Sequence, residues 1–243
     1  LFFMSSTIRL YFPDKIQSEL SSHLTNEQTH YVKDVMRLRI GDKISIFNSL
    51  GEWNAIIQSY EKNGAKIIIK EKVRDKSSEK NIWLAFSPIK QNPLNFVIQK
   101  GTELGVHKFT PILSDRTIVR EVNIERLKKI AVEASEQSNR ISVPEINKPE
   151  PLNFFLTKFP KNGCLIFCDI NSTQNNLNNI FEKKVDDPIC ILIGPEGDFS
   201  QDERKMIIDH NQTYSISLAK NILKSETAAL SAITIVNYHL NLS

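Results

Sequence analysis

Two tight turns near the end of the sequence carry residues that could bind a ligand. The first turn, Gly194–Gly197 (Gly-Pro-Glu-Gly), follows the apolar run Ile189–Ile193. The second turn, Leu218–Lys224, places apolar residues beside two lysines. Glycine lets the backbone approach a ligand closely, and an apolar slot edged by cations suits a nucleoside-like ligand beside a polyanion. Either turn alone could be a plain connection, but together they predict one pocket.

Other common binding motifs are not found in the sequence. No G-x-G-x-x-G opens a helix after the first turn, and no Gly-Lys-Ser/Thr follows it. The five histidines lack zinc-ligand spacing, so we expect no metal. Three cysteines are too few for a disulfide framework, and we expect buried thiols in a reducing cytosol at Cys164, Cys168 and Cys190.

A polar stripe lies at the end of a predicted helix over residues 124–139. Glu133, Gln137 and Arg140 recur at i, i+4 and i+7, so they share one face. Such a stripe is either a solvated face or an edge that meets RNA or another subunit. Glu226 opens the last predicted helix, where its charge complements the helix dipole.

Strands that alternate with helices must position these residues. The apolar patterns predict strands at 82–86, 108–113, 165–168, 189–193 and 214–218. Helices are predicted at 95–103, 124–139, 200–210 and 225–238, the third from the capping box Ser200–Glu203. This alternation predicts an α/β domain with a mostly parallel sheet. Ligands of such sheets bind at the carboxyl ends of the strands, where both turns would lie.

The N-terminal part reads as short strands and turns. Apolar runs at 43–47, 53–57 and 65–69, with the Asn63-Gly64 turn signal, predict a small β-barrel. A capping box at Thr25–Gln28 predicts one helix within it. The charged segment 71–80 is the best boundary, so we expect domains at 1–73 and 81–243.

Composition sets wider limits. The net charge of +3 over 243 residues permits a nucleic-acid partner without demanding one. No apolar stretch reaches the roughly 18 residues of a membrane span, so we expect a cytoplasmic protein without a membrane partner. Leu1-Phe2-Phe3 before Met4 is too short for a signal peptide, and we expect a cloning remnant or an alternative start. The amide-rich run 171–179 is expected to form a surface loop.

Four segments resemble the motifs of the RsmE family, in the same order along the chain: 99–106, 133–140, 194–200 and 218–229. Arg37–Asp42 also resembles an N-terminal signature of that family. The family comprises the small-subunit ribosomal RNA uridine-N3 methyltransferases of the SPOUT (trefoil-knot) superfamily. The resemblance covers nearly the whole chain.

This resemblance implies a PUA-like β-barrel that binds RNA, followed by an α/β domain whose chain forms a trefoil knot. S-adenosyl-L-methionine would bind in the knot as methyl donor, in a homodimer without metal. The substrate would be a uridine in the decoding region of 16S rRNA, methylated within the assembled small ribosomal subunit.

The resemblance also implies roles for individual residues. One wall of the cofactor site would be Ile193, Gly194 and Gly197; the other would be Ser217, Leu218, Ala219, Ile222 and Leu223. RNA contacts would come from Arg9, Arg37, Arg39 and Lys220. The family usually has Gly at position 219 and Arg at position 224, and Lys224 keeps the charge without the bidentate fork.

Methylation of uracil N3 requires loss of its proton or stabilisation of its anion. A carboxylate such as Glu196 or Glu226 could act as base, or a cation such as Lys224 or Arg140 could stabilise the charge on the uracil carbonyls. We favour the cation. N3 lies on the pairing edge, so the base must be unpaired or flipped. Two alternatives stay open: a non-catalytic RNA-binding assembly factor, and a knotted methyltransferase acting on ribose 2′-oxygen.

Overall fold

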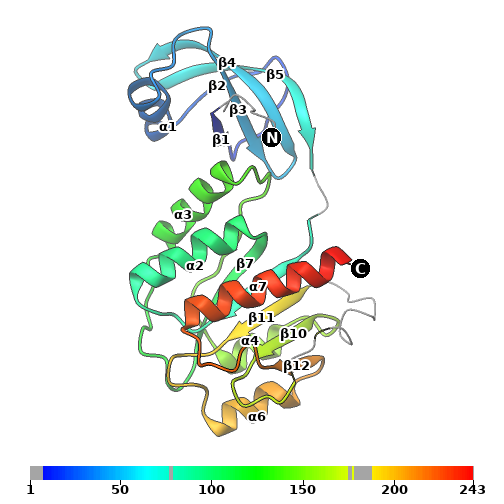
Figure 1. Cartoon of the computed structure of the whole chain (residues 1–243). Helices are drawn as coiled ribbons and strands as arrows, with labels where there is room; N and C mark the ends of the chain where they lie inside the picture. The colour runs from blue at the N-terminus through cyan, green and yellow to red at the C-terminus, as the bar shows by residue number, and fades with distance from the viewer. Residues whose placement is uncertain (1–7, 77–78, 175–176, 178–187, 243) are drawn as a thin grey trace. The chain divides into compact units, whose positions relative to one another are not determined.

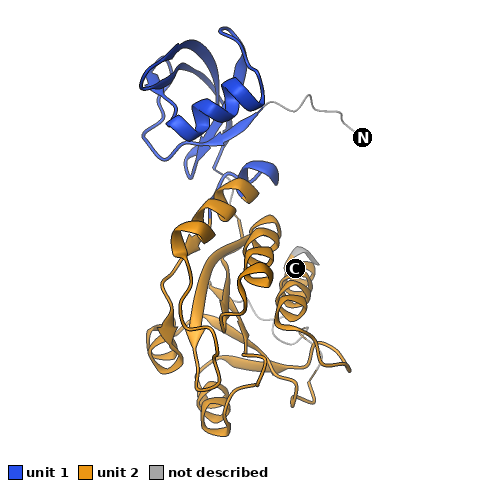
Figure 2. Cartoon of the chain, turned by 90° about the vertical axis from the view of Figure 1, so that its left-hand side faces the viewer, with its two compact units in different colours: residues 1–78, 135–143 blue, residues 79–134, 144–243 orange. Residues whose placement is uncertain are grey.

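The computed structural model describes residues 8–76, 79–174, 177 and 188–242 (Figure 1). Residues 1–3 and part of the amide-rich run 171–179 lie outside this range. The chain divides into two compact units (Figure 2). The N-terminal unit contains residues 1–78 and 135–143, and the C-terminal unit contains residues 79–134 and 144–243.

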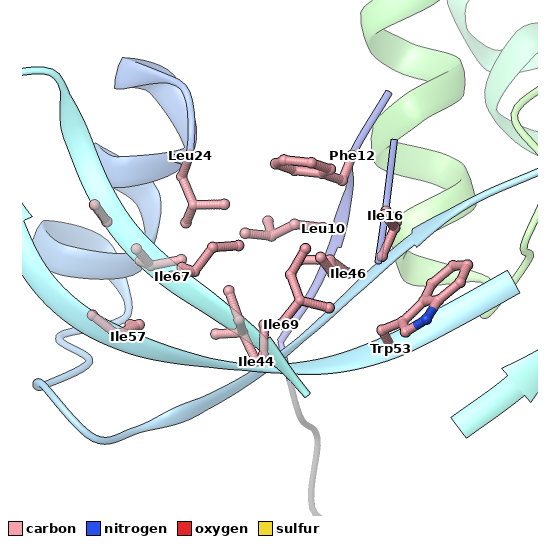
Figure 3. Packing of buried hydrophobic residues seen from close by; sticks show 13 residues of the cluster. Leu10, Phe12, Ile16, Leu24, Ile44, Ile46, Trp53, Ile57, Ile67 and Ile69 are labelled. Atoms are coloured by element: carbon pink, nitrogen blue, oxygen red, sulfur yellow. The ribbon is translucent and has the colours of Figure 1, made fainter. Parts of the chain in front are cut away.

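The N-terminal unit is built on a five-stranded sheet with the order β1-β3-β4-β5-β2. Its strands are β1 (Arg9–Tyr11), β2 (Ser21–His23), β3 (Lys43–Asn48), β4 (Gly51–Glu61) and β5 (Gly64–Asp75). Alternating residues of the strands face one apolar core, including Ile44, Ile46, Ile57, Ile67 and Ile69 (Figure 3). Register shifts interrupt the long β4–β5 pairing, and such irregularities let a sheet curl around its core.

One short helical segment closes this unit. Helix α1 (Asn26–His30) begins after Thr25, whose side chain accepts a hydrogen bond from the Gln28 amide. The Gln28 side chain in turn accepts from the Thr25 backbone, so the predicted capping box is present. A single π-helical stretch follows at Tyr31–Val35.

Residues 135–143 belong to the N-terminal unit because Arg9 holds them there. Its guanidinium pairs with Glu52 at 2.9 Å, and the exposed fractions of the two side chains are 11% and 9%. The same guanidinium donates to the carbonyls of Glu136 at 2.9 Å and Arg140 at 2.8 Å. Burial by itself raises the pKa of Glu52, but hydrogen bonds from Arg9 and Ser45 lower it below its usual range.

The C-terminal unit contains a parallel sheet with the order β12-β10-β11-β6-β7-β8, and β9 also pairs with β7. Its strands are β6 (Ile82–Phe86), β7 (Val106–Leu113), β8 (Glu145–Ile146), β9 (Glu150–Pro151), β10 (Cys164–Cys168), β11 (Ile189–Ile193) and β12 (Thr213–Ile216). Its helices are α2 (Gln91–Glu103), α3 (Ile124–Gln137), α4 (Leu152–Lys158), α6 (Gln201–Asp209) and α7 (Ser225–Leu242). The predicted α/β architecture with a parallel sheet is confirmed.

Both faces of this sheet are covered. One set of alternating strand residues, including Phe167 and Leu192, packs with residues of α4 and α6 such as Phe155 and Ile207. Helix α7 contacts β11 and packs against α2 (Figure 1). The chain therefore leaves the edge strand β12 and returns over the middle of the sheet. Sheets covered on both faces need strands that are apolar throughout, as β10 and β11 are.

Several predicted element ends differ from the structure, and three of the differences have an identifiable reason or consequence. Helix α2 begins at Gln91 instead of Asn95, because Pro93 is tolerated in a first helical turn. Helix α3 ends before Asn139, whose φ of 63° is left-handed. Strand β12 ends at Ile216, so Ser217 and Leu218 both belong to the loop that follows. The three cysteines are free, as predicted.

Candidate active site

The two predicted turns meet at one edge of the sheet. Strands β12, β10 and β11 are parallel neighbours, so their carboxyl ends lie side by side. The hydroxyl of Ser225, which follows the second turn, donates to the carbonyl of Gly194 in the first at 3.4 Å. Between them lies a third segment, Asp169–Gln174, whose Gln174 carbonyl accepts from the Ser217 amide at 2.7 Å. The structure therefore brings three loops together.

The two glycines of the first turn differ in how closely other atoms surround them. The Asp198 amide donates to the Pro195 carbonyl at 2.9 Å, and Asp198 has a left-handed φ of 60°. A Cβ at Gly194 would lie 2.9 Å from the ring of Phe199, so a side chain would displace that ring. At Gly197 the nearest atom to such a Cβ is 3.6 Å away, and the residue is exposed. Gly194 is needed for packing, whereas a Cβ at Gly197 would make only an ordinary van der Waals contact with the Arg116 side chain.

A loop after β7 braces the first turn from the side. The Arg116 guanidinium donates to the Gly197 carbonyl at 2.7 Å. The Asp115 amide donates to the Glu203 carboxylate at 2.8 Å, and the Asp115 carboxylate accepts from the Ser200 hydroxyl at 3.0 Å. Ser200 and Glu203 form the predicted capping box of α6. Our sequence reading missed this loop, although the polar run 114–117 directly follows a predicted strand.

A buried carboxylate holds the third loop. The Asp169 side chain is 0% exposed and accepts from Arg204 Nη2 at 2.7 Å, Ser215 Oγ at 3.0 Å and the Asn171 amide at 2.9 Å. Burial alone raises the pKa of Asp169, but the hydrogen bonds from Arg204, Asn171 and Ser215 outweigh it and lower the pKa. Asp169 thus ties the ends of β10 and β12 to α6. The sequence reading missed it, although it directly follows the buried run 164–168.

The second turn presents both apolar and cationic side chains to solvent. Ile222 is 85% exposed, and Ala219, Lys220 and Lys224 are exposed as well, while Ser217, Leu218 and Leu223 are half-buried. Ala219 does not have a left-handed φ, so its methyl group causes no backbone strain. The carbonyl of Lys224 accepts from the Ala228 amide, which places Lys224 at the start of α7.

The remaining predicted residues are distributed over both units. Glu226 is half-buried in the first helical turn of α7. Glu196 is exposed in the Gly194–Gly197 turn. Arg140 belongs to the N-terminal unit, where it is buried and donates to the Ser142 hydroxyl at 2.8 Å. Arg37 and Arg39 are exposed after the π-helical stretch. Arg9 lies inside the N-terminal unit, as described above.

The residues that the structure describes contain no helix long and apolar enough to cross a membrane. They also contain no group of three or more His, Cys, Asp or Glu side chains arranged to hold a metal ion.

Comparison with known proteins identifies the family. A family model described as an RNA methyltransferase domain matches residues 76–237, and one described as an RNA methyltransferase PUA domain matches residues 24–70. "Ribosomal RNA small subunit methyltransferase E" from Rickettsia conorii is 34% identical over 228 residues, covering 93% of each chain. The protein of the same name from Bacillus subtilis is 27% identical over 241 residues, covering 94% of each chain.

Solved structures agree with this result. Ribosomal RNA small subunit methyltransferase E from Neisseria gonorrhoeae, bound to S-adenosyl methionine, superposes with a TM-score of 0.86 at 28% identity. That comparison covers 96% of this chain and 97% of the other. The expected fold, a SPOUT-type α/β domain preceded by a PUA-like domain, is confirmed. The chain belongs to the RNA methyltransferase family.

Proposed function

We propose that the protein transfers the methyl group of S-adenosylmethionine to N3 of one uridine in small-subunit ribosomal RNA. The observation that carries this proposal is that three loops, which follow the carboxyl ends of β10, β11 and β12, are hydrogen-bonded to one another at one edge of the sheet. It is supported by relatives named for methylation of small-subunit ribosomal RNA. The nucleotide and the N3 position follow from the resemblance of the motifs at 99–106, 133–140, 194–200 and 218–229.

The residues at this edge fit an adenosine-containing cofactor. Two isoleucines, Ile222 in the second turn and Ile170 in the Asp169–Gln174 loop, are 85% and 60% exposed, and each offers an apolar side chain to a purine. Gly197 leaves its backbone open to a close approach. Backbone groups of Gly194 and of Ser217 to Leu223 would then bind the ribose and the amino-acid moiety.

Rate enhancement should come mainly from alignment and from stabilisation of charge. The cofactor supplies an electrophilic methyl group on sulfonium, and the transfer is an in-line displacement. Lys224 is exposed where α7 begins, so it can approach a uracil carbonyl and stabilise the N3 anion. Arg140, the other cation predicted from the sequence, is buried in the N-terminal unit and donates to the Ser142 hydroxyl at 2.8 Å, so Lys224 is the stronger candidate. Glu226 complements the dipole of α7, which is a sufficient structural role.

Exposed cationic side chains would bind the RNA. In the N-terminal unit Arg37 and Arg39 are exposed and remain candidates, as does Lys220 on the second turn. Arg9 is a weaker candidate, because its guanidinium is bound to Glu52 and to backbone carbonyls. The substrate would be the assembled small subunit in the cytoplasm.

We further propose a homodimer formed through α2 and α7. These helices pack against each other and expose Phe96 and Tyr238, respectively. Sedimentation of the wild type and of Phe96→Asp tests this point: a wild type that sediments as a monomer at all concentrations contradicts it.

The decisive experiment is incubation with small ribosomal subunits and labelled S-adenosylmethionine, followed by mapping of the methylated nucleotide. Mass spectrometry of the nucleosides distinguishes N3-methyluridine from a 2′-O-methylated product. N3-methyluridine supports the proposal, and a ribose product rejects it in favour of the alternative knotted enzyme. Absence of cofactor binding would favour the assembly factor.

Calorimetry of Gly197→Val tests the location of the pocket. The added side chain should abolish cofactor binding while the thermal unfolding temperature stays close to that of the wild type, because Gly197 is exposed and a Cβ there would make only an ordinary contact, 3.6 Å from Arg116 Cδ. Undiminished binding by this variant would reject the pocket.

A further inference from the structure

We propose that Arg116 binds a phosphate group of the RNA substrate beside the first turn. This inference rests on the proposed function, because it concerns how RNA reaches the same site. Arg116 lies outside the sequence motifs, 81 residues before its partner Gly197.

The geometry of Arg116 leaves most of its donors available. One Nη1 donor reaches the Gly197 carbonyl at 2.7 Å, and the aliphatic stem runs along Gly197, with Cδ 3.6 Å from the position of a Cβ there. Guanidinium carries five N–H donors in a fixed fork. The residue is exposed, and within the described ranges no carboxylate forms an ion pair with it. Arg116 is thus held in place at the turn without being neutralised.

The carboxylates around Arg116 are mostly engaged by other donors. The Asp115 carboxylate accepts from Ser200, and Glu203 accepts from the amides of Asp115 and Ser200. Asp198 accepts from the Phe199 amide and from Asn171. Glu196 is the exposed carboxylate of this turn. None of these carboxylates accepts a hydrogen bond from Arg116 among the described residues, so its remaining donors are open to an external anion.

A phosphodiester is the anion that best matches this arrangement. A guanidinium fork can donate two parallel hydrogen bonds to a phosphate, which fixes both distance and orientation. Exposed cations on the second turn, Lys220 and Lys224, offer charge of the same sign along the same strand ends. A phosphate bound at Arg116 would fix the nucleotide next to the exposed first turn. Arg116 would therefore position the substrate.

The test compares the salt dependence of RNA binding between wild type and Arg116→Gln. The probe is a single-stranded, uridine-rich RNA oligonucleotide, titrated between about 50 and 200 mM salt. Loss of one phosphate contact should reduce the slope of log K against log[salt] by about 0.7 and weaken binding by about ten-fold or more. Calorimetric affinity for S-adenosylmethionine should stay within about two-fold. Arg116→Lys should retain the slope with weaker binding, because it keeps the charge and loses the fork.

Lys205→Gln is the matched control. It removes one exposed positive charge from α6 in the same unit and should leave the RNA affinity nearly unchanged. An unchanged slope and RNA affinity in Arg116→Gln would overturn the proposal. So would a loss of cofactor affinity with an unchanged slope, because Arg116 would then only brace the Gly197 turn. A reduced slope in a protein whose wild type transfers no methyl group would support the phosphate contact while rejecting the proposed function.

Discussion

Replacement of Asp169 should destabilise the C-terminal unit more than any surface change. Asp169→Ala removes the acceptor for Arg204, Ser215 and the Asn171 amide at a position with 0% side-chain exposure. Breaking a fully buried ion pair costs about 3–5 kcal/mol. Arg204 is 35% exposed and can be solvated by water, so we expect Asp169→Ala to lower the free energy of unfolding by about 2–3 kcal/mol. Asp169→Asn keeps one acceptor oxygen, so we expect it to lower the free energy of unfolding by only about 1–2 kcal/mol.

Urea unfolding followed by Trp83 fluorescence in a Trp53→Phe background measures this loss, because Trp83 lies in β6 of the C-terminal unit. Asp209→Asn, an exposed carboxylate on α6, should stay within about 0.5 kcal/mol of the wild type. The pH dependence gives an independent check. The pKa of Asp169 is lowered by folding, so its contribution is fully present above the unfolded value of about 3.9 and is lost as pH falls through the folded value. A loss below about 0.5 kcal/mol for Asp169→Ala near neutral pH would refute the reasoning.

Three further outcomes are expected. Arg9→Ala should destabilise the N-terminal unit by about 2 kcal/mol, read from Trp53 fluorescence, because it removes one of the two guanidinium partners of the buried Glu52 and leaves only Arg74, at 3.1 Å; equal stability of wild type and variant would contradict this. Ser200→Ala should cost about 1 kcal/mol in urea unfolding through loss of the α6 cap. Alkylation by iodoacetamide at pH 8 should be slow in the folded protein and fast in urea, because burial raises the pKa of all three thiols, to about 12 for Cys164. Rapid labelling of the folded protein would show that the strands are less protected than their burial indicates.

Much of the architecture could be predicted from local sequence. Strands β6 and β11 have the predicted bounds, and the capping boxes at Thr25 and Ser200 have the predicted hydrogen bonds. These features depend on residues a few positions apart, so periodicity and side-chain type suffice to find them. The two turns at Gly194 and Leu218 were also found locally, and the parallel sheet then required their strand ends to lie at one edge.

The remaining features depend on pairs that are distant in the chain. Sequence shows Asp169 as one polar residue after a strand, and only the fold brings it to Arg204 and Ser215. Likewise Arg9 is an ordinary strand residue until the fold places the carbonyls of Glu136 and Arg140 within its reach. The contact between Gly197 and the guanidinium of Arg116 also depends on residues that are distant in the chain. The sequence by itself determined the elements, the family and the two turns, because these depend on local patterns. Tertiary structure alone decided which charges are buried and paired and which stay open to a ligand, because charge pairing depends on distance in space.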